Sequence, residues 1–149
     1  MKRTNKIIAL ILALVCSVAL LAACGGTTDK DGKITVVLGL DVPVEYEVDL
    51  GELTVDAGLF SVLDYLAAEG KLTYEKNGTM ISSVGELKPD AAKGEYIYIY
   101  TSVEADFDVS DWGTTMEYKG MTLTSSGVGA GDMTVSDGAV IYIGTIIYG

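Results

Sequence analysis

The chain has 149 residues, of which 21 are acidic and ten basic, and it contains two cysteines and no histidine. This length suffices for one domain. The absence of histidine excludes Ser-His-Asp and Cys-His nucleophile activation and every metal site that needs an imidazole ligand. Carboxylate pairs, Ser/Lys pairs and oxygen-ligated hard cations remain as catalytic options, but no Ser-x-x-Lys pattern occurs. We therefore expect a protein that is not an enzyme and has no cofactor.

The N-terminus has the features of a secretion signal. Lys2, Arg3 and Lys6 form a basic head, and residues 7–23 carry no charge. A basic segment followed by an apolar run and small residues is typical of a signal peptide. The sequence therefore predicts export, with residues 1–23 as the signal peptide.

The end of this segment, Leu21-Ala22-Ala23-Cys24, resembles the bacterial lipobox. The resemblance implies that the thiol of Cys24 carries a diacylglyceryl group and that the chain is cut just before it. The alternative is an uncleaved membrane helix, since the 17 uncharged residues lie at the lower edge of the length that spans a bilayer. Both interpretations place the rest of the chain outside the cytoplasm. We expect an extracytoplasmic lipoprotein, lipid-anchored to the cell membrane.

The mature chain would be strongly acidic. Without residues 1–23 it carries seven basic and 21 acidic residues, a net charge of −14. Such a surface repels phosphate backbones, so we expect no nucleic-acid partner. Once Cys24 carries lipid, no cysteine remains for a disulfide or a thiol nucleophile.

The mature chain begins with a short linker and a predicted hairpin. Residues 24–33 comprise the lipidated cysteine and a Gly-rich polar tether. Residues 34–40 are an apolar, β-branched run, and residues 44–50 alternate apolar with acidic side chains, which predicts a half-buried strand with an acidic outer face. The domain is expected to occupy residues 34–149.

One helix is predicted in the domain. Asp56 can cap it and Gly70 can end it. Its apolar side chains recur at helical spacing and should lie on a sheet: Leu59, Val62, Leu63 and Leu66.

The remaining segments predict strands. Asn77-Gly78 is a hairpin signal between two strand segments, and Gly120 separates two more. Residues 96–100 alternate tyrosine with isoleucine, and residues 139–148 form a nearly continuous apolar strand, which is typical of a central strand buried on both faces. A hairpin, a helix and further strands predict an α+β fold, a β-grasp-like mixed sheet with one packed helix.

Three segments of this domain resemble a bacterial secreted-domain family of unassigned function, related to the C-terminal β-domain of transcobalamin and intrinsic factor. They are residues 60–66 (FSVLDYL), 77–85 (NGTMISSVG) and 94–100 (GEYIYIY). Ile97 stands where the family has a strand tryptophan. The resemblance implies a small β-grasp-like module at the surface of a Gram-positive-type cell, often beside transport machinery. In the vertebrate carriers this domain encloses cobalamin together with a helical barrel, so a corrinoid-like ligand is implied as well.

Aromatic residues supply the candidate binding site. Tyr96, Tyr98 and Tyr100 would share one strand face, and Trp112, the sole tryptophan, lies in the polar segment that follows. Tyrosine offers a large apolar face with a hydrogen-bonding tip, which suits a ring-shaped ligand or a sugar. Two structural alternatives remain open: the tyrosines only cover a sheet face, and Trp112 only folds back over the core.

Two further patterns are weaker. Asp106, Asp108, Ser110 and Glu117 occupy calcium-loop positions, but Asp111 stands where an EF-hand needs glycine. A looser calcium site that includes Glu104 and a solvated acidic loop are both open, and no metal ligand is assigned. The Gly-rich segment 127–131 lacks the context of a phosphate loop and predicts a flexible turn.

Two classes of function fit these features. The first is a non-catalytic module that binds a small molecule or glycan through aromatic side chains and serves a membrane transporter. The second is a structural or adhesion module that binds another protein through a sheet edge.

Overall fold

The computed structural model describes residues 31–148. The predicted signal peptide, the lipidation at Cys24 and most of the tether lie outside the described residues. Within residues 31–148, no helix is both long and apolar enough to cross a bilayer.

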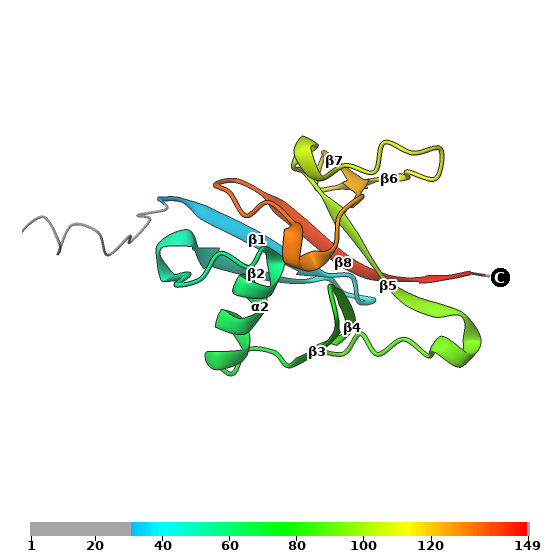
Figure 1. Cartoon of the computed structure of the whole chain (residues 1–149), viewed down its shortest axis with the longest axis horizontal. Helices are drawn as coiled ribbons and strands as arrows, with labels where there is room; N and C mark the ends of the chain where they lie inside the picture. The colour runs from blue at the N-terminus through cyan, green and yellow to red at the C-terminus, as the bar shows by residue number, and fades with distance from the viewer. Residues whose placement is uncertain (1–30, 149) are drawn as a thin grey trace, which may run out of the picture.

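The described chain forms a six-stranded sheet, a separate two-stranded sheet and one α-helix (Figure 1). The order in the larger sheet is β2-β1-β8-β5-β7-β6, with β1 and β8 parallel and every other pair antiparallel. The larger sheet contains β1 (Lys33–Leu38), β2 (Val44–Asp49), β5 (Glu95–Thr101), β6 (Thr115–Tyr118), β7 (Met121–Ser125) and β8 (Val140–Ile147). The remaining elements are α2 (Leu59–Ala68), the hairpin strands β3 (Tyr74–Asn77) and β4 (Met80–Val84), and the 3-10 helices η1 (Leu50–Glu52), η2 (Ala91–Lys93), η3 (Glu104–Asp106) and η4 (Ala130–Asp132). The predicted α+β class, with one α-helix on a mostly antiparallel sheet, is confirmed.

The first hairpin forms as predicted. β1 pairs antiparallel with β2 from Lys33↔Asp49 to Leu38↔Val44. Tyr46 and Val48 turn inward, whereas Glu45 and Glu47 are exposed. The alternation of apolar and acidic side chains therefore places the acidic face of β2 in solvent, because successive side chains of a strand point to opposite faces.

Helix α2 carries the predicted apolar stripe but begins differently from the prediction. Its N-cap is Gly58 rather than Asp56, and no side chain caps it. Gly58 has a φ of +58°, and a Cβ there would lie 2.6 Å from the carbonyl oxygen of Gly131, so neighbouring backbone leaves no room for a capping side chain. The other end is as predicted: Gly70 follows the last turn, and the N–H of Lys71 donates to the carbonyl of Leu66.

The main core lies between α2 and one face of the large sheet. Leu59, Leu63 and Leu66 of α2 are fully buried, together with Ile141 and Ile143 of β8. The β3–β4 hairpin closes the same layer, and Ile81 and Val84 of β4 belong to the core. The Asn77-Gly78 signal thus marks a real hairpin, which packs on the core as a separate sheet.

β8 is central, as predicted, but it is not buried on both faces: Ile141 and Ile143 are fully buried, whereas Val140 and Tyr142, on the other face, are half-buried. It runs between β1 and β5 as far as Ile143. Beyond that residue β8 pairs only with β5, and Ile147 is 68% exposed. The apolar run from 139 to 148 therefore continues past the end of the core, which an unbroken hydrophobic sequence does not reveal.

The opposite face of the sheet is partly covered by the β6–β7 hairpin. Val37 and Leu123 are fully buried there, outside the main core. The ring of Tyr118 lies 5.5 Å from that of Tyr142, and its hydroxyl donates to Glu45 of β2. The hairpin therefore reaches across the sheet face from β7 to the far edge strand.

Candidate ligand-binding face

β5 separates its tyrosines from its isoleucines, as predicted. Ile97 and Ile99 pack against the main core, so the alternate side chains of Tyr96, Tyr98 and Tyr100 point to the face opposite α2. Directly across from Tyr98 on β8 is Gly144, which has no side chain to cover the ring. The three tyrosines therefore line one open sheet face.

The stripe is not uniform along its length. Tyr98 and Tyr100 are half-buried and meet edge to face, with ring centroids 5.1 Å apart. Tyr96 is 43% exposed, and its ring lies 6.0 Å from that of Tyr148, itself 61% exposed. Tyr148 was not among the predicted site residues, because its approach to Tyr96 depends on the pairing of β5 with β8, which the sequence does not show.

Trp112 lies in a loop that is hydrogen-bonded to Tyr98 and Tyr100. The hydroxyl oxygens of Tyr98 and Tyr100 are 3.3 and 3.2 Å from Oγ1 of Thr114, two residues after Trp112. The indole is 85% exposed and belongs to no ring pair among the described residues. The alternative in which Trp112 folds back over the core is therefore wrong, because the side chain stands in solvent beside the stripe.

The turn before Trp112 is ordered by its own polar groups. The N–H of Ser110 donates to Asp108 at 2.9 Å, and the N–H of Trp112 donates to Oγ of Ser110 at 3.3 Å. The hydrogen bonds from Ser110 lower the pKa of the Asp108 carboxyl. Asp108 therefore works as a turn residue at neutral pH.

The acidic loop does not gather into a cation site. Asp106 is buried and accepts hydrogen bonds from the backbone N–H and the hydroxyl of Thr134, at 2.7 and 2.9 Å. Within residues 31–148, no three Asp, Glu, His or Cys side chains lie close enough together to hold a metal ion. Asp106 thus joins two loops through its carboxylate.

The Gly-rich segment 127–131 is packed rather than free. A Cβ on Gly129 would lie 3.0 Å from the side chain of Thr79, and the N–H of Ala130 donates to the carbonyl of Thr79 at 3.0 Å. The prediction of a flexible turn is therefore wrong. The glycines allow this segment to lie against the tip of the β3–β4 hairpin.

A groove runs between β4 and β5, on the core side of the sheet. One pocket of 320 Å³ is bordered by Met80, Ile81, Tyr96 and Ile97. A second pocket of 150 Å³ continues it past Ile97 toward Ile99 and the glycine segment. Tyr96 thus borders both this groove and the tyrosine face.

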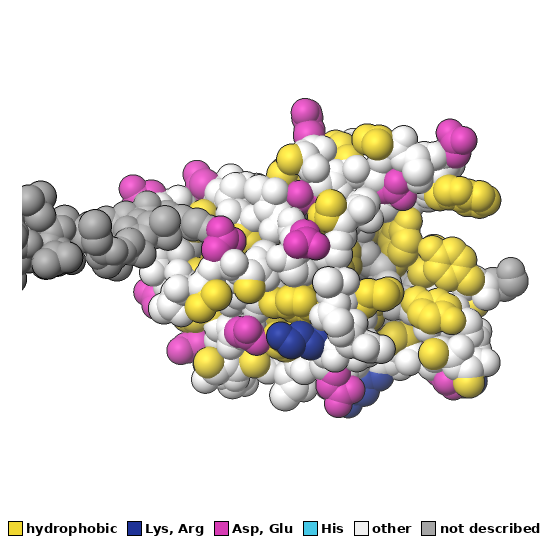
Figure 2. Space-filling view, viewed as in Figure 1, with side chains coloured by type: hydrophobic (Ala, Val, Ile, Leu, Met, Phe, Trp, Pro, Cys, Tyr) yellow, Lys and Arg dark blue, Asp and Glu magenta, His cyan; other side chains and the backbone are white. Residues whose placement is uncertain are grey.

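Hydrophobic side chains also collect on the surface near the groove. They gather on the side of the molecule where β8 ends and β5 begins, near the C-terminus, while carboxylates are scattered over the view (Figure 2). Trp112, Ile147, Met80 and Tyr148 are among the most exposed large hydrophobic side chains of residues 31–148, as are Val109, Val42 and Val55. This end of the molecule is therefore the part of the described surface with the features of a binding site.

Comparisons with known proteins identify no family. No protein-family profile matches the chain, and no curated protein matches it. The chain resembles the crystal structure, at 1.30 Å resolution, of a "putative metal binding protein" from Ruminococcus gnavus ATCC 29149. The two are 20% identical, and the match has a TM-score of 0.49 and covers 81% of this chain and 100% of that one. The function of this chain is therefore inferred from its own residues.

Proposed function

We propose that this protein is an extracytoplasmic lipoprotein whose domain binds, without catalysis, a small molecule or glycan that presents a flat ring. The observation that carries the proposal is the cluster of exposed aromatic side chains at the open end of β5. Tyr96, Tyr148 and Trp112 are all more than two-fifths exposed there.

The physical basis is stacking. An aromatic ring that stacks on a ligand contributes about 0.5–1.5 kcal/mol beyond the area it buries. Aromatic rings on neighbouring segments can contact a ligand from two sides. The contacts of Thr114 with the hydroxyls of Tyr98 and Tyr100 place the Trp112 loop next to this half-buried pair. Tyr96, Tyr98, Tyr100 and Trp112 are therefore the proposed lining, with Tyr148 added.

The order of the strands supports a β-grasp-like domain. A hairpin, β1–β2, is followed by one packed helix, and the last strand lies parallel to the first in the centre of the sheet. This arrangement is in line with the resemblance to the C-terminal domain of transcobalamin and intrinsic factor, which makes a corrinoid-like ring one of the ligand classes proposed. A membrane transporter is the proposed recipient of the ligand.

Binding is tested with the mature chain by fluorescence of Trp112, the only tryptophan. Cobinamide, haem and short glycans are titrated in turn. We expect one class to quench or shift the emission, and Tyr96→Ala and Trp112→Ala to weaken that binding several-fold without lowering the melting temperature by more than a few degrees; binding by Trp112→Ala is followed by calorimetry.

The matched control is Met121→Ala, on β7, where the side chain is also partly exposed but belongs to no part of the proposed lining. This variant should bind like the wild type. If Tyr96→Ala and Trp112→Ala melt early and bind with unchanged affinity, the aromatics are structural and the proposal fails.

The lipid anchor is tested separately in cells. Globomycin, which blocks the lipoprotein peptidase, should cause a precursor to accumulate. Cys24→Ser should release the protein from the membrane or mislocalise it, because the thiol that accepts the lipid is gone. A Cys24→Ser protein that is cut elsewhere and still stays on the membrane would contradict lipidation.

A further inference from the structure

β5 is hydrogen-bonded along only part of one edge. On the β8 side it is paired along its whole length, from Glu95↔Ile147 to Thr101↔Ile141. On the other side β7 pairs with it only at Tyr100 and Thr101. The edge of β5 from Glu95 to Ile99 therefore has no neighbouring strand in the sheet.

The alternation of hydrogen bonds shows which backbone groups point out of this open edge. The carbonyl of Gly94 accepts from Tyr148 on the β8 side, so the even-numbered residues of β5 face β8 and the odd-numbered ones face away. Glu95 donates its N–H to Asp90, and the carbonyl of Ile99 accepts from Ser126. Among the described residues, the Ile97 N–H and carbonyl and the Ile99 N–H have no backbone partner. Two donors and an acceptor thus point into the β4–β5 groove.

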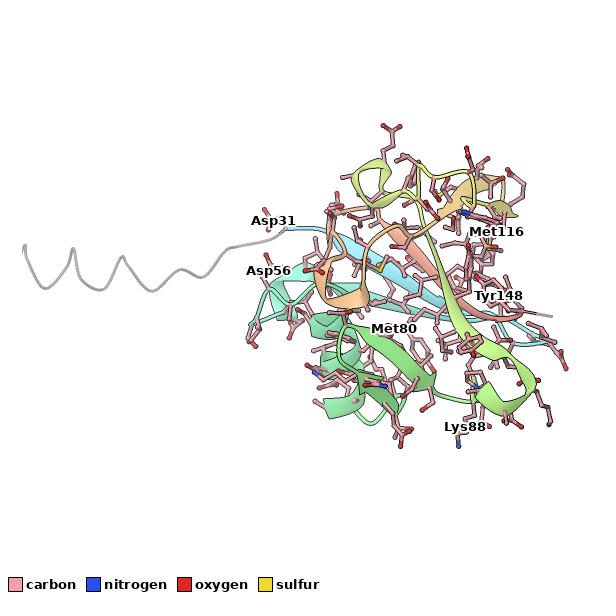
Figure 3. All side chains as sticks on the ribbon, turned by 45° about the vertical axis from the view of Figure 1, so that its right-hand side comes forward. Asp31, Asp56, Met80, Lys88, Met116 and Tyr148 are labelled. Atoms are coloured by element: carbon pink, nitrogen blue, oxygen red, sulfur yellow. The ribbon has the colours of Figure 1, made fainter. Side chains whose placement is uncertain are left out.

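The groove beside this edge has places for side chains. The pocket of 320 Å³ lies beside Glu95 to Ile97, and the pocket of 150 Å³ lies beside Ile97 to Ile99. Alternate residues of an added strand would lie about 7 Å apart on the same face. Successive inward-pointing side chains could therefore enter the two pockets, which Met80 borders on the β4 side. In Figure 3 the ribbon of β5 passes between Met80, which borders the groove, and the exposed Tyr148.

One of the two edge strands of the sheet, β2, differs from this opening. β2 follows Pro43 and presents the exposed carboxylates Glu45 and Glu47, which are devices that discourage strand addition at an edge. The open stretch of β5 has isoleucines and tyrosines instead. Unpaired backbone groups adjoin two mainly apolar pockets there.

We propose that the Glu95–Ile99 edge of β5 binds an extended, basic segment of a partner protein as an additional strand. Backbone hydrogen bonds supply affinity in this mode, and alternate side chains supply specificity. The charge of the domain selects the partner: residues 31–148 carry 20 acidic and six basic side chains, so a cationic segment is attracted. A second copy of this chain would bring the same negative charge and be repelled. This site shares the border residue Tyr96 with the proposed ring-binding face, but Tyr148 and Trp112 of that face do not line the groove.

The probe is a capped peptide of alternating lysine and valine, seven residues long with lysine at both ends. A residue opposite Ile97 shares its face and exchanges hydrogen bonds with it, so the valines enter the groove and their backbone groups face β5. We expect the amide signals of Ile97 and Ile99 to shift on titration and to become protected from hydrogen exchange. Methylating the backbone nitrogens of the valines should weaken binding about tenfold or more, because donors to β5 are lost. Methylating the backbone nitrogens of the lysines, which point away from β5, should change the affinity less than about twofold.

Two variants separate this groove from the rest of the surface. Met80 is 62% exposed, so Met80→Trp should fold normally and fill the groove, weakening peptide binding at least several-fold. Met121→Trp, a substitution of the same kind on β7, should have no effect. Trp112→Ala should leave the affinity for the peptide unchanged but lower the affinity for the ring ligand. Failure of one proposal is therefore distinguishable from failure of the other.

Three results would overturn the proposal. Equal binding of both methylated peptides would show attraction by charge without strand pairing. Equal affinity of the Met80→Trp and Met121→Trp variants for the peptide would show that it binds outside the β4–β5 groove. Protection of the Ile97 and Ile99 amides in the free protein, with dimers in sedimentation, would show that a second copy occupies the edge.

Discussion

The two ends of β5 differ in every property that matters for folding and binding. At Thr101 the strand is paired on both sides, the side chain is fully buried, and the residue opposite is the core residue Ile141. At Tyr96 the strand is paired on one side only, and the residue opposite, Ile146, is only half-buried. One end therefore stabilises the domain, and the other leaves aromatic and backbone groups free to meet a partner.

The difference arises because the covering layers are shorter than the sheet. α2 and the β3–β4 hairpin cover the first half of β8, and the β6–β7 hairpin covers part of the opposite face. The last residues of β8 extend beyond both layers, and the first residues of β5 lie beside the open β4–β5 groove. Apolar surface that folding leaves exposed in one place on a small protein usually marks an interaction site.

The largest expected effect comes from a charge at the closed end. Leu63→Asp places a carboxylate at a fully buried position of α2, which loses several kcal/mol through burial and desolvation, so the domain should unfold. Circular dichroism and thermal melting measure this. Tyr96→Asp at the open end should melt within a few degrees of the wild type; equal destabilisation by both variants would refute the comparison.

A matched pair on β8 measures the same contrast more finely. Ile143 is fully buried, and Ile143→Ala should cost about 2–5 kcal/mol of unfolding free energy. Ile147 is mostly exposed, and Ile147→Ala should cost less than about 1 kcal/mol. Urea denaturation gives both values. Similar costs would mean that the C-terminal half of β8 is packed in solution.

The smallest expected effect concerns the contact that holds the β6–β7 hairpin over the sheet. Tyr118 donates to Glu45, which also pairs with Lys119 at 2.5 Å. Burial and the hydrogen bond to Glu45 raise the pKa of Tyr118 to about 12. A group whose pKa is raised on folding stabilises the folded state. This stabilisation is fully present below the pKa of the unfolded state, near 10, and is lost as the pH rises through the pKa of the folded state, about 12.

Tyr118→Phe should therefore cost about 0.5–1 kcal/mol at neutral pH, because the contact is partly exposed. The stability difference between wild type and variant should disappear between pH 10 and 12, as measured by urea denaturation at several pH values. A difference that persists at pH 12 would show that the effect is packing rather than the hydrogen bond. Tyr142→Phe, which removes a hydroxyl on the same face but not this bond, is the control.

Much of the candidate site could be predicted from the sequence, but two of its features could not. The alternation of tyrosine and isoleucine placed Tyr96, Tyr98 and Tyr100 on one face, because a strand has a period of two. Tyr148 escaped notice because its ring approaches Tyr96 only through the register between β5 and β8. The exposure of Trp112 could not be predicted either, since it depends on where Thr114 meets the tyrosine hydroxyls.

The sequence by itself determined the elements: the acidic outer face of β2, the apolar stripe of α2, the hairpin at Asn77-Gly78 and the strands that follow. These depend on local periodicity and turn chemistry, which neighbouring residues settle. Only the tertiary structure decided that Gly58 rather than Asp56 begins the helix, that the glycine segment 127–131 is packed, and that β7 leaves β5 after two residues. Each of these depends on backbone from a distant segment, because close approach and strand pairing join residues that are far apart in the chain. The open edge of β5 is for the same reason a property of the fold, although each residue along it is an ordinary strand residue.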